Sequence, residues 1–437
     1  MIRVKVARNG RELDDVFHLR WHVYAQEEGL FGGSGSVPYI SDRFDAHPVC
    51  YNLIAYDGAE PVATLRLNGD TGAGLPADRY FDFSAYRRSL VEEASRPGGR
   101  PPSLGCASML AVRRRWRHRR DIIATLFKMA AGLGLAHGTT HVIVAVAERT
   151  QAMYRRMGFA PVGERTWIEE IGDHVVPLAA PFDAFARWAF DRRLLQPHSM
   201  ALLEGETERI LLSAGETLFR EGERGEECYM VESGLLRATR RASQDGRELL
   251  LATFAPGDIV GELALIDDEP RSATVTAASN SEVLVLGREE FRRRLGGPHG
   301  DPDTLLRIFA ERMRRMDDLA LLLAYGGAHQ KLLYALRSLY RAATPERRRP
   351  EVRSVTASAE DIAQMAGVDP AVAQAALEWL QQTGACEVRG RRVRFLREPA
   401  AAMEEAQTPF TPRPAGASRP EGDGKVPLAL AASRPRR

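Results

Sequence analysis

Short apolar runs separated by regularly spaced glycines dominate residues 200–295 and limit what this segment can fold into. Runs this short are typical of strands, and turn residues about every ten positions predict an antiparallel sandwich or barrel. The turn glycines are Gly215, Gly222, Gly225, Gly234, Gly246, Gly257 and Gly261.

The segments on either side follow other patterns, so we expect a multidomain α+β protein. The first segment alternates β-like runs with helical patterns, which predicts an α/β domain. The tail is rich in Ala, Pro, Gly and Arg and is expected to be disordered. We therefore expect an α/β domain over 1–192, a β-barrel over 200–300, a long helix over 303–326, a small helical domain closed by a hairpin over 328–397, and a tail over 399–437.

Composition excludes several classes of protein. The 437 residues are 44% hydrophobic and 27% charged, as in globular proteins, and the net charge of +2 is not that of a nucleic-acid polycation. No apolar run approaches the roughly 20 residues needed to span a membrane. The four cysteines lack metal-ligand or disulfide spacing, so we expect no metal site and a cytoplasmic location.

The stretch GELALIDDEPRSATV, residues 261–275, combines three features that suit one anionic ligand. Gly261 permits close approach of the backbone, and Arg271 offers a planar fork for two phosphate oxygens. Glu262 can accept hydrogen bonds from a ribose hydroxyl. Because a buried Arg and a buried Glu each need a partner, a cyclic nucleotide would satisfy both.

The same stretch resembles the phosphate-binding cassette of the cyclic-nucleotide-binding domains in catabolite activator protein and protein kinase A. AGETLFREGERGEECYMVESGLLRA, residues 214–238, resembles the first strands of that jelly-roll-like barrel. The resemblance implies either cAMP or cGMP as the effector. It also implies ligand contacts from Gly261, Glu262, Leu263, Arg271, Ser272 and Ala273.

An apolar stripe runs along the expected helix Thr304–Tyr325. Such a stripe packs on a barrel or forms the seam of a homodimer, and the sequence supports both interpretations. Its residues are Leu305, Ile308, Phe309, Met313, Met316, Leu319, Leu322 and Leu323.

SAEDIAQMAGVDPAVAQAALEWLQQTGACEVRGRRVRF, residues 358–395, resembles the winged helix-turn-helix that follows the barrel in the same regulators. Ser358 and Pro370 stand where an N-cap and a first-turn proline belong. Base readout needs polar side chains at the start of the second helix, where only Gln374 qualifies. DNA binding is therefore possible, but a packing or relay module is favoured.

Six arginines crowd the run RRRWRHRR, residues 113–120, between an apolar strand and an expected helix. A basic loop at a helix N-terminus suits an anion, such as the phosphates of an acyl donor. A solvated charge run is the alternative. The residues expected to bind the donor are Val112, Arg115, Arg117, Arg119 and Arg120.

AERTQAMYRRMGF, residues 147–159, resembles the last helix and strand of the Gcn5-related acyltransferase (GNAT) fold. On that resemblance Tyr154 is the general acid that protonates the leaving thiolate; a half-buried core tyrosine is the alternative. FHLRWHVYAQEEG, SDRFDAHP and VATLRL are similar to the autoinducer-synthase branch of that fold, which includes N-acyl amino acid synthases. That similarity implies acceptor binding by Arg20, Asp42, Asp45 and Arg66.

These patterns support two functions. The first is an N-acyltransferase, regulated by a cyclic nucleotide, that moves an acyl group from acyl-CoA or acyl-carrier protein to an amino acid amine or a protein lysine. The second is a cAMP-responsive transcription regulator with an acyltransferase-like sensor domain. A third interpretation keeps the N-terminal segment as a binding module without catalysis.

Overall fold

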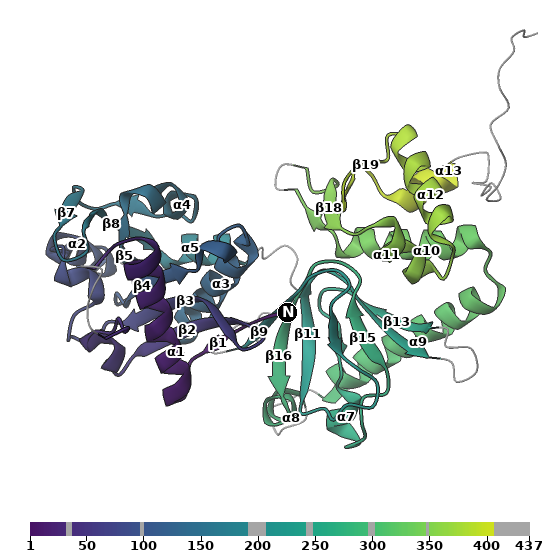
Figure 1. Ribbon diagram of the computed structural model, residues 1–437, viewed down its shortest axis with the longest axis horizontal. Coiled ribbons are helices and arrows are strands. Elements are labelled where there is room, and N and C mark those ends of the chain that lie inside the picture. The colour runs from purple at the N-terminus through teal and green to yellow at the C-terminus, as the bar shows by residue number, and fades with distance from the viewer. Residues whose placement is uncertain are drawn as a thin grey trace, which may run out of the picture.

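The computed structural model describes residues 1–31, 37–96, 100–190, 207–241, 248–295, 302–346 and 349–405. It has three parts, which we call the N-terminal domain (1–190), the β domain (207–295) and the C-terminal domain (328–405). The β domain lies between the other two (Figure 1). The helix α9 (Pro302–Tyr325) connects it to the C-terminal domain.

The N-terminal domain is built on one sheet in the order β1-β2-β3-β4-β5-β8-β6, with β7 paired to β8. Its strands are β1 (Ile2–Val6), β2 (Cys50–Asp57), β3 (Glu60–Gly69), β4 (Leu104–Val112), β5 (His141–Ala147), β6 (Ala160–Pro161), β7 (Thr166–Ile168) and β8 (Asp173–Pro181). Its helices are α1 (Gly10–Trp21), α2 (Ser84–Ala94), α3 (Arg120–Ala136), α4 (Gln151–Arg156) and α5 (Phe182–Ala189), with short turns η1 (His22–Glu27), η2 (Arg43–Ala46), η3 (Pro76–Arg79), η4 (Arg114–Trp116) and η5 (Glu148–Thr150).

Alternation along β5 explains how helices cover both faces of this sheet. Val142 and Val144 belong to the core formed with α3 and α5, whereas Ile143 belongs to a second core formed with η3 and α2. Successive side chains of a strand point to opposite faces, so an apolar run such as HVIVAVA serves both cores.

The parallel strands β4 and β5 separate in the middle of the sheet. They are in register only over Leu104–Cys106 and His141–Ile143, although both strands continue well beyond these residues. Within the extension of β4, Met109 has a φ of 54°, a left-handed conformation that is uncommon outside glycine. The divergence opens the sheet at its centre and positions a cleft there.

The β domain consists of two antiparallel sheets packed face to face around one apolar core. One sheet has the order β14-β11-β16-β9 and the other β10-β15-β12-β13. The strands are β9 (Arg209–Leu212), β10 (Thr217–Phe219), β11 (Glu227–Ser233), β12 (Leu236–Arg241), β13 (Glu248–Phe254), β14 (Ile259–Val260), β15 (Thr274–Ala277) and β16 (Ser281–Gly287), with helices α7 (Leu263–Ile266) and α8 (Arg288–Leu295).

An edge strand of each domain joins the N-terminal and β domains into one sheet. β1 pairs antiparallel with β9, with Ile2 opposite Leu211 and Val4 opposite Arg209. Among the described residues, the combined sheet has 12 strands. The two domains are therefore held together by backbone hydrogen bonds as well as by side chains.

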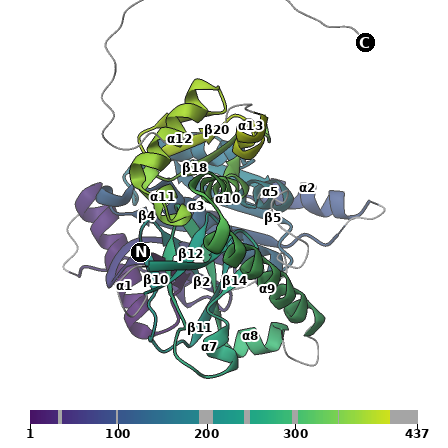
Figure 2. The ribbon, with the colours of Figure 1, turned by 90° about the vertical axis from the view of Figure 1, so that its right-hand side faces the viewer.

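Helix α9 lies across the β domain on the side away from the N-terminal domain (Figures 1 and 2). Leu319 is buried, whereas Leu306, Met313 and Met316 are exposed. The C-terminal domain follows with α10 (Ala328–Ala342), β17 (Thr344–Pro345), β18 (Arg353–Thr356), α11 (Ala359–Ala366), α12 (Pro370–Gln382), β19 (Cys386–Arg389), β20 (Arg392–Phe395) and α13 (Pro399–Glu405).

The expected tail begins too early. Residues Pro399–Glu405 form α13, because Ala402 and Met403 are apolar and become buried in the C-terminal core. Residues 191–206 and 406–437 lie outside the described residues. None of the helices that the structure describes is long and apolar enough to cross a membrane.

Candidate functional site

Arg271 is almost fully buried in the β domain, and its guanidinium group is held by backbone carbonyls. Nη1 donates to the Gly261 carbonyl and Nη2 to the Glu227 carbonyl, both at 2.6 Å. Gly261 has a φ of +83°, and a Cβ there would lie 2.7 Å from Nη1. The glycine is thus required both by its backbone conformation and by the close approach of the arginine.

Glu262, beside this guanidinium group, is only partly satisfied. One carboxylate oxygen, Oε1, accepts a hydrogen bond from Arg312 of α9, whose guanidinium group lies over the Phe254 ring. The other, Oε2, is buried and has no partner in the described part of the chain. Burial raises the pKa of Glu262 despite the nearby arginine. A buried carboxylate oxygen without a partner is costly and indicates room for a donor.

A small cavity of about 30 Å³ lies between these groups. The structure brings all six residues expected to contact a nucleotide to its lining. They are Gly261, Glu262, Leu263, Arg271, Ser272 and Ala273. Arg312 also lines the cavity, and the sequence reasoning missed it.

The four residues expected to bind the acceptor lie together in the N-terminal domain. Arg66 forms a bidentate salt bridge with Asp42, with N–O distances of 2.6 and 3.0 Å. Its Nη1 also lies 3.0 Å from the Asp45 carboxylate. Its Nε donates to the Ser108 hydroxyl at 3.0 Å. Arg20 pairs with the other Asp45 oxygen at 2.9 Å. The four charges form one nearly closed network.

Asp45 is the centre of that network because it bridges both arginines. Burial alone would raise the pKa of its carboxyl group, but the Arg20 and Arg66 guanidinium groups hold the pKa below its usual value. Arg20 is fully buried, so the carboxylate also neutralises a charge that has no access to solvent. The network therefore positions groups beside the cleft and itself has few free hydrogen-bonding atoms.

A cleft of about 390 Å³ opens where β4 and β5 diverge. Asp42, Arg66 and Ser108 line it, and so does Tyr154 of α4. The Tyr154 ring packs edge-on against Phe127 and Phe159, with centroids 5.8 and 5.5 Å apart. Burial raises the pKa of the Tyr154 phenol, so the group keeps its proton at neutral pH.

The arginine run before α3 is only partly available to a ligand. Arg117 pairs with Glu27 and Glu28, and Arg119 pairs with Asp121. Val112 and Arg117 line the cleft. Arg115 and Arg120 are exposed, and neither has an ion-pair partner among the residues that the structure describes. Both guanidinium groups are therefore accessible to a ligand, although that of Arg115 lies 5.5 Å from the centre of the Trp116 ring.

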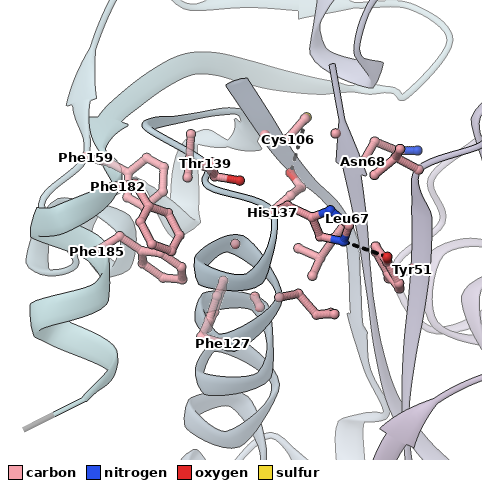
Figure 3. Close-up of a pocket in the computed structure, with 18 residues that line it drawn as sticks. Tyr51, Leu67, Asn68, Cys106, Phe127, His137, Thr139, Phe159, Phe182 and Phe185 are labelled. Atoms are coloured by element: carbon pink, nitrogen blue, oxygen red, sulfur yellow. Dashed lines mark hydrogen bonds between the residues drawn. The ribbon is translucent and has the colours of Figure 1, made fainter. Parts of the chain in front are cut away.

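An apolar pocket of about 60 Å³ lies on the α3 side of the sheet. In Figure 3, Phe159, Phe182 and Phe185 stand on one side of it and Leu67 on the other, with Phe127 of α3 between them. Cys106 borders both this pocket and the cleft. No motif marks the pocket in the sequence, since small and aromatic residues from separate elements form it.

In the C-terminal domain, the start of α12 offers few polar groups. Asp369 caps the helix by accepting from the Ala371 backbone N–H. The Gln374 amide donates to Glu378 at 2.9 Å and is therefore already engaged. Across the described ranges, no group of three or more His, Cys, Asp or Glu side chains is arranged to hold a metal ion.

Two family models match the chain. Residues 15–181 match the model of N-acyl amino acid synthase FeeM, and residues 209–296 match that of the cyclic nucleotide-binding domain. The protein therefore contains a FeeM-like acyltransferase domain and a cyclic-nucleotide-binding domain. These domains are the N-terminal and β domains described above.

Two relatives identify the family of the cyclic-nucleotide-binding domain more closely. The cyclic AMP receptor protein of Thermus thermophilus is 32% identical over 147 residues, covering 34% of this chain and 68% of that protein. The CRP-like cAMP-activated global transcriptional regulator of Mycobacterium tuberculosis is 32% identical over 124 residues, 28% of this chain and 55% of that protein. Through this region the chain belongs to the cyclic AMP receptor protein family.

The chain spans about half the length of that mycobacterial relative. The structure of FeeM, an N-acyl amino acid synthase from uncultured soil microbes, is 14% identical with a TM-score of 0.36, covering 45% of this chain and 99% of that one.

Proposed function

We propose that the protein is an N-acyltransferase whose activity is set by a cyclic nucleotide. The observation that carries the proposal is the cleft between β4 and β5, within the residues that match the synthase model. Its lining includes a paired carboxylate and arginine, Asp42 and Arg66, and the phenol of Tyr154. These are groups that position an amine and protonate a leaving group.

In this reaction the amine nitrogen attacks the thioester carbonyl carbon, and the carbon–sulfur bond breaks. The Tyr154 hydroxyl gives its proton to the leaving thiolate and regains one from the amine nitrogen. Beyond Cys106, β4 has no register partner on β5, so its backbone can polarise the carbonyl oxygen. Asp42 is the group that would hold the incoming amine.

The acyl donor would use two neighbouring regions. The apolar pocket beside Cys106 suits an acyl chain, and the exposed Arg115 and Arg120 suit the phosphates of CoA or the acidic surface of an acyl-carrier protein. A thioester placed across the diverging strands would bring its carbonyl carbon into the cleft. The acceptor is then an amino acid amine or a protein lysine.

The effector would bind in the β domain, with its cyclic phosphate on Arg271 and its ribose hydroxyl on Glu262. The relatives support cAMP as the nucleotide, since two of them carry it in their names. The exposed Met313 and Met316 of α9 are compatible with a homodimer.

Mass spectrometry of reaction products tests the proposal. Full-length protein is incubated with acyl-CoA or acyl-carrier thioesters and a mixture of amino acids, with and without cAMP. We expect an N-acyl amino acid whose rate changes with cAMP. Tyr154→Phe should lower kcat about 100-fold, whereas the control Tyr86→Phe, outside the cleft, should not. No amide product from any donor would refute the proposal.

A second candidate is a cAMP-responsive transcription regulator, with the N-terminal domain as a sensor. The helices α11 and α12 meet at Gly367, and the β19–β20 hairpin follows them, which is the order of a winged helix-turn-helix. The proposal is weakened by the engaged Gln374 at the start of α12. A gel-shift assay with random DNA pools, with and without cAMP, tests it; no retained sequence would exclude specific readout.

A further inference from the structure

Strand β11 touches the nucleotide cavity at one end and the N-terminal domain at two places. Its first residue, Glu227, supplies the carbonyl that accepts from Arg271. The carboxylate of the same residue accepts from Arg3 of β1 at 2.5 Å. Arg3 also donates to Glu208, just before β9. One residue therefore contacts the phosphate-binding arginine through its backbone and the N-terminal domain through its side chain.

The second contact lies near the other end of β11. Glu232 is buried and lies 3.2 Å from the Lys128 ammonium group of α3, which also binds Glu282 of β16. Arg209 of β9 completes the cluster, 3.1 Å from Glu232. Two cations and two carboxylates balance each other between the domains. The Thr125 hydroxyl of α3 donates to Glu282 at 3.0 Å.

Helix α3 connects this cluster with the apolar pocket. Lys128 and Thr125 face the β domain, while Phe127, Ala130 and Leu133 line the pocket. Lys128 and Phe127 are neighbours in the chain. A small rotation or shift of α3 driven from the β domain would therefore change the shape of the pocket, since a close-packed interior transmits displacement.

We propose that β11 couples the nucleotide site to the acyl pocket, through Glu227 and Arg3 to β1 and through Glu232 and Lys128 to α3. This coupling rests on the proposed function and describes how the nucleotide would regulate it. A cyclic phosphate competes for the same Arg271 N–H groups that now bind the Gly261 and Glu227 carbonyls. Binding therefore releases Glu227, and the change passes to the N-terminal domain without α9.

The proposed coupling predicts which kinetic constant the nucleotide changes. Helix α3 lines the apolar pocket that would hold the acyl chain, and it carries none of the groups proposed to react in the cleft. The nucleotide should therefore change KM for the acyl donor more than kcat. An effect of about fivefold or more on KM is the usual size of such coupling.

Arg3→Gln tests the proposal, with Lys5→Gln as the matched control. Both residues lie on β1, but Lys5 pairs at 2.8 Å with Glu12 of its own domain. Three quantities are measured on full-length protein: the Kd for cAMP by calorimetry, the donor KM with and without cAMP, and the cAMP-induced change in hydrogen exchange over residues 120–136. Exchange reports the coupling even where no acyl transfer occurs.

In the wild type and Lys5→Gln we expect cAMP to change both donor KM and exchange in α3. In Arg3→Gln both responses should fall by about half, because one of the two contacts is lost, with the Kd for cAMP unchanged. Thr125→Val, a mild change at the other contact, should weaken them partly. Full responses in Arg3→Gln would overturn the proposal, and so would a weakened Kd, which would make Arg3 a support of the nucleotide site.

The outcomes separate this inference from the proposed function. An exchange response that depends on Arg3, without acyl transfer from any donor, would support the coupling and refute the acyltransferase. Acyl transfer with no cAMP response in the wild type would overturn the coupling and leave the enzyme.

Discussion

Two buried arginines, one in each of the first two domains, have opposite surroundings. Arg66 is 1% exposed, and its N–H groups bind two carboxylates and a hydroxyl. Arg271 is 5% exposed, donates hydrogen bonds to two backbone carbonyls and lies over the Phe219 ring, and its Nε has no hydrogen-bond partner among the described residues. The first charge is hydrogen-bonded to carboxylates of its own domain, whereas no carboxylate in the described part of the chain forms an ion pair with the second.

This difference suits Arg66 to positioning other groups and suits Arg271 to binding a ligand. A charge-neutralised arginine keeps its geometry whether or not a substrate is present, which suits the wall of a catalytic cleft. An arginine without a counterion gains most from a ligand that brings one. We therefore expect substitutions in the first site to affect stability most, and substitutions in the second to affect ligand affinity most.

The largest effect should come from Asp45→Asn. It leaves the buried Arg20 without its carboxylate and should destabilise the N-terminal domain by about 3–5 kcal/mol. Urea unfolding followed by tryptophan fluorescence measures this, because four of the five tryptophans lie in this domain: Trp21, Trp116, Trp167 and Trp188. The exposed-pair variant Asp70→Asn is the control. Equal stability of the two variants would remove the contrast drawn above.

The same residue predicts a pH dependence. The pKa of Asp45 is lower in the folded protein than in the unfolded chain, so its stabilising contribution is complete above the ordinary aspartate pKa. The contribution is lost as the pH falls through the folded value. Wild-type stability should therefore drop below about pH 4, and Asp45→Asn should show a smaller drop.

Arg271→Gln should weaken cAMP binding about 100-fold, since truncation of a desolvated charge partner costs about 2–5 kcal/mol of affinity. Its effect on stability should stay at about 1–2 kcal/mol, because the losses are hydrogen bonds to carbonyls and contacts with the Phe219 and Tyr229 rings, and no ion pair is broken. Calorimetry and urea unfolding check the two values, with the surface variant Arg240→Gln as the control. Unfolding of the β domain in Arg271→Gln would contradict this interpretation.

Arg312→Gln should act in the opposite direction and strengthen cAMP binding about fivefold. Arg312 donates a hydrogen bond to the Glu262 carboxylate, which a ribose hydroxyl would use. Loss of the guanidinium group therefore leaves that carboxylate free. The control is Arg315→Gln, one turn along α9, where the arginine binds Asp258 instead. If affinity falls in Arg312→Gln, then Arg312 contacts the ligand and does not compete with it.

Ser108→Ala should give the smallest change. It removes one hydrogen bond to Arg66 while both carboxylates remain, so the loss should be about 1 kcal/mol in urea unfolding. The exposed Ser89→Ala should be neutral. A loss as large as that of Asp45→Asn would show that the hydroxyl, and not the carboxylates, fixes Arg66.

The sequence allowed some of these sites to be predicted because the residues that form them are close in the chain or follow a known order. Glu262 and Arg271 are nine positions apart, on either side of the short helix α7. Arg312 was missed because its contact with Glu262 spans 50 residues and depends on how α9 packs. The β1–β9 pairing was missed for a similar reason. Nothing in an isolated strand pattern identifies its neighbour 205 residues away.

The shared sheet also determines how the two domains can be studied. Separation of the N-terminal and β domains would expose the unpaired backbone of β1 on one fragment and that of β9 on the other. Open strand edges of this kind recruit other chains. Each domain produced alone should therefore self-associate. Mixing the two fragments should restore solubility, because β1 and β9 can pair again.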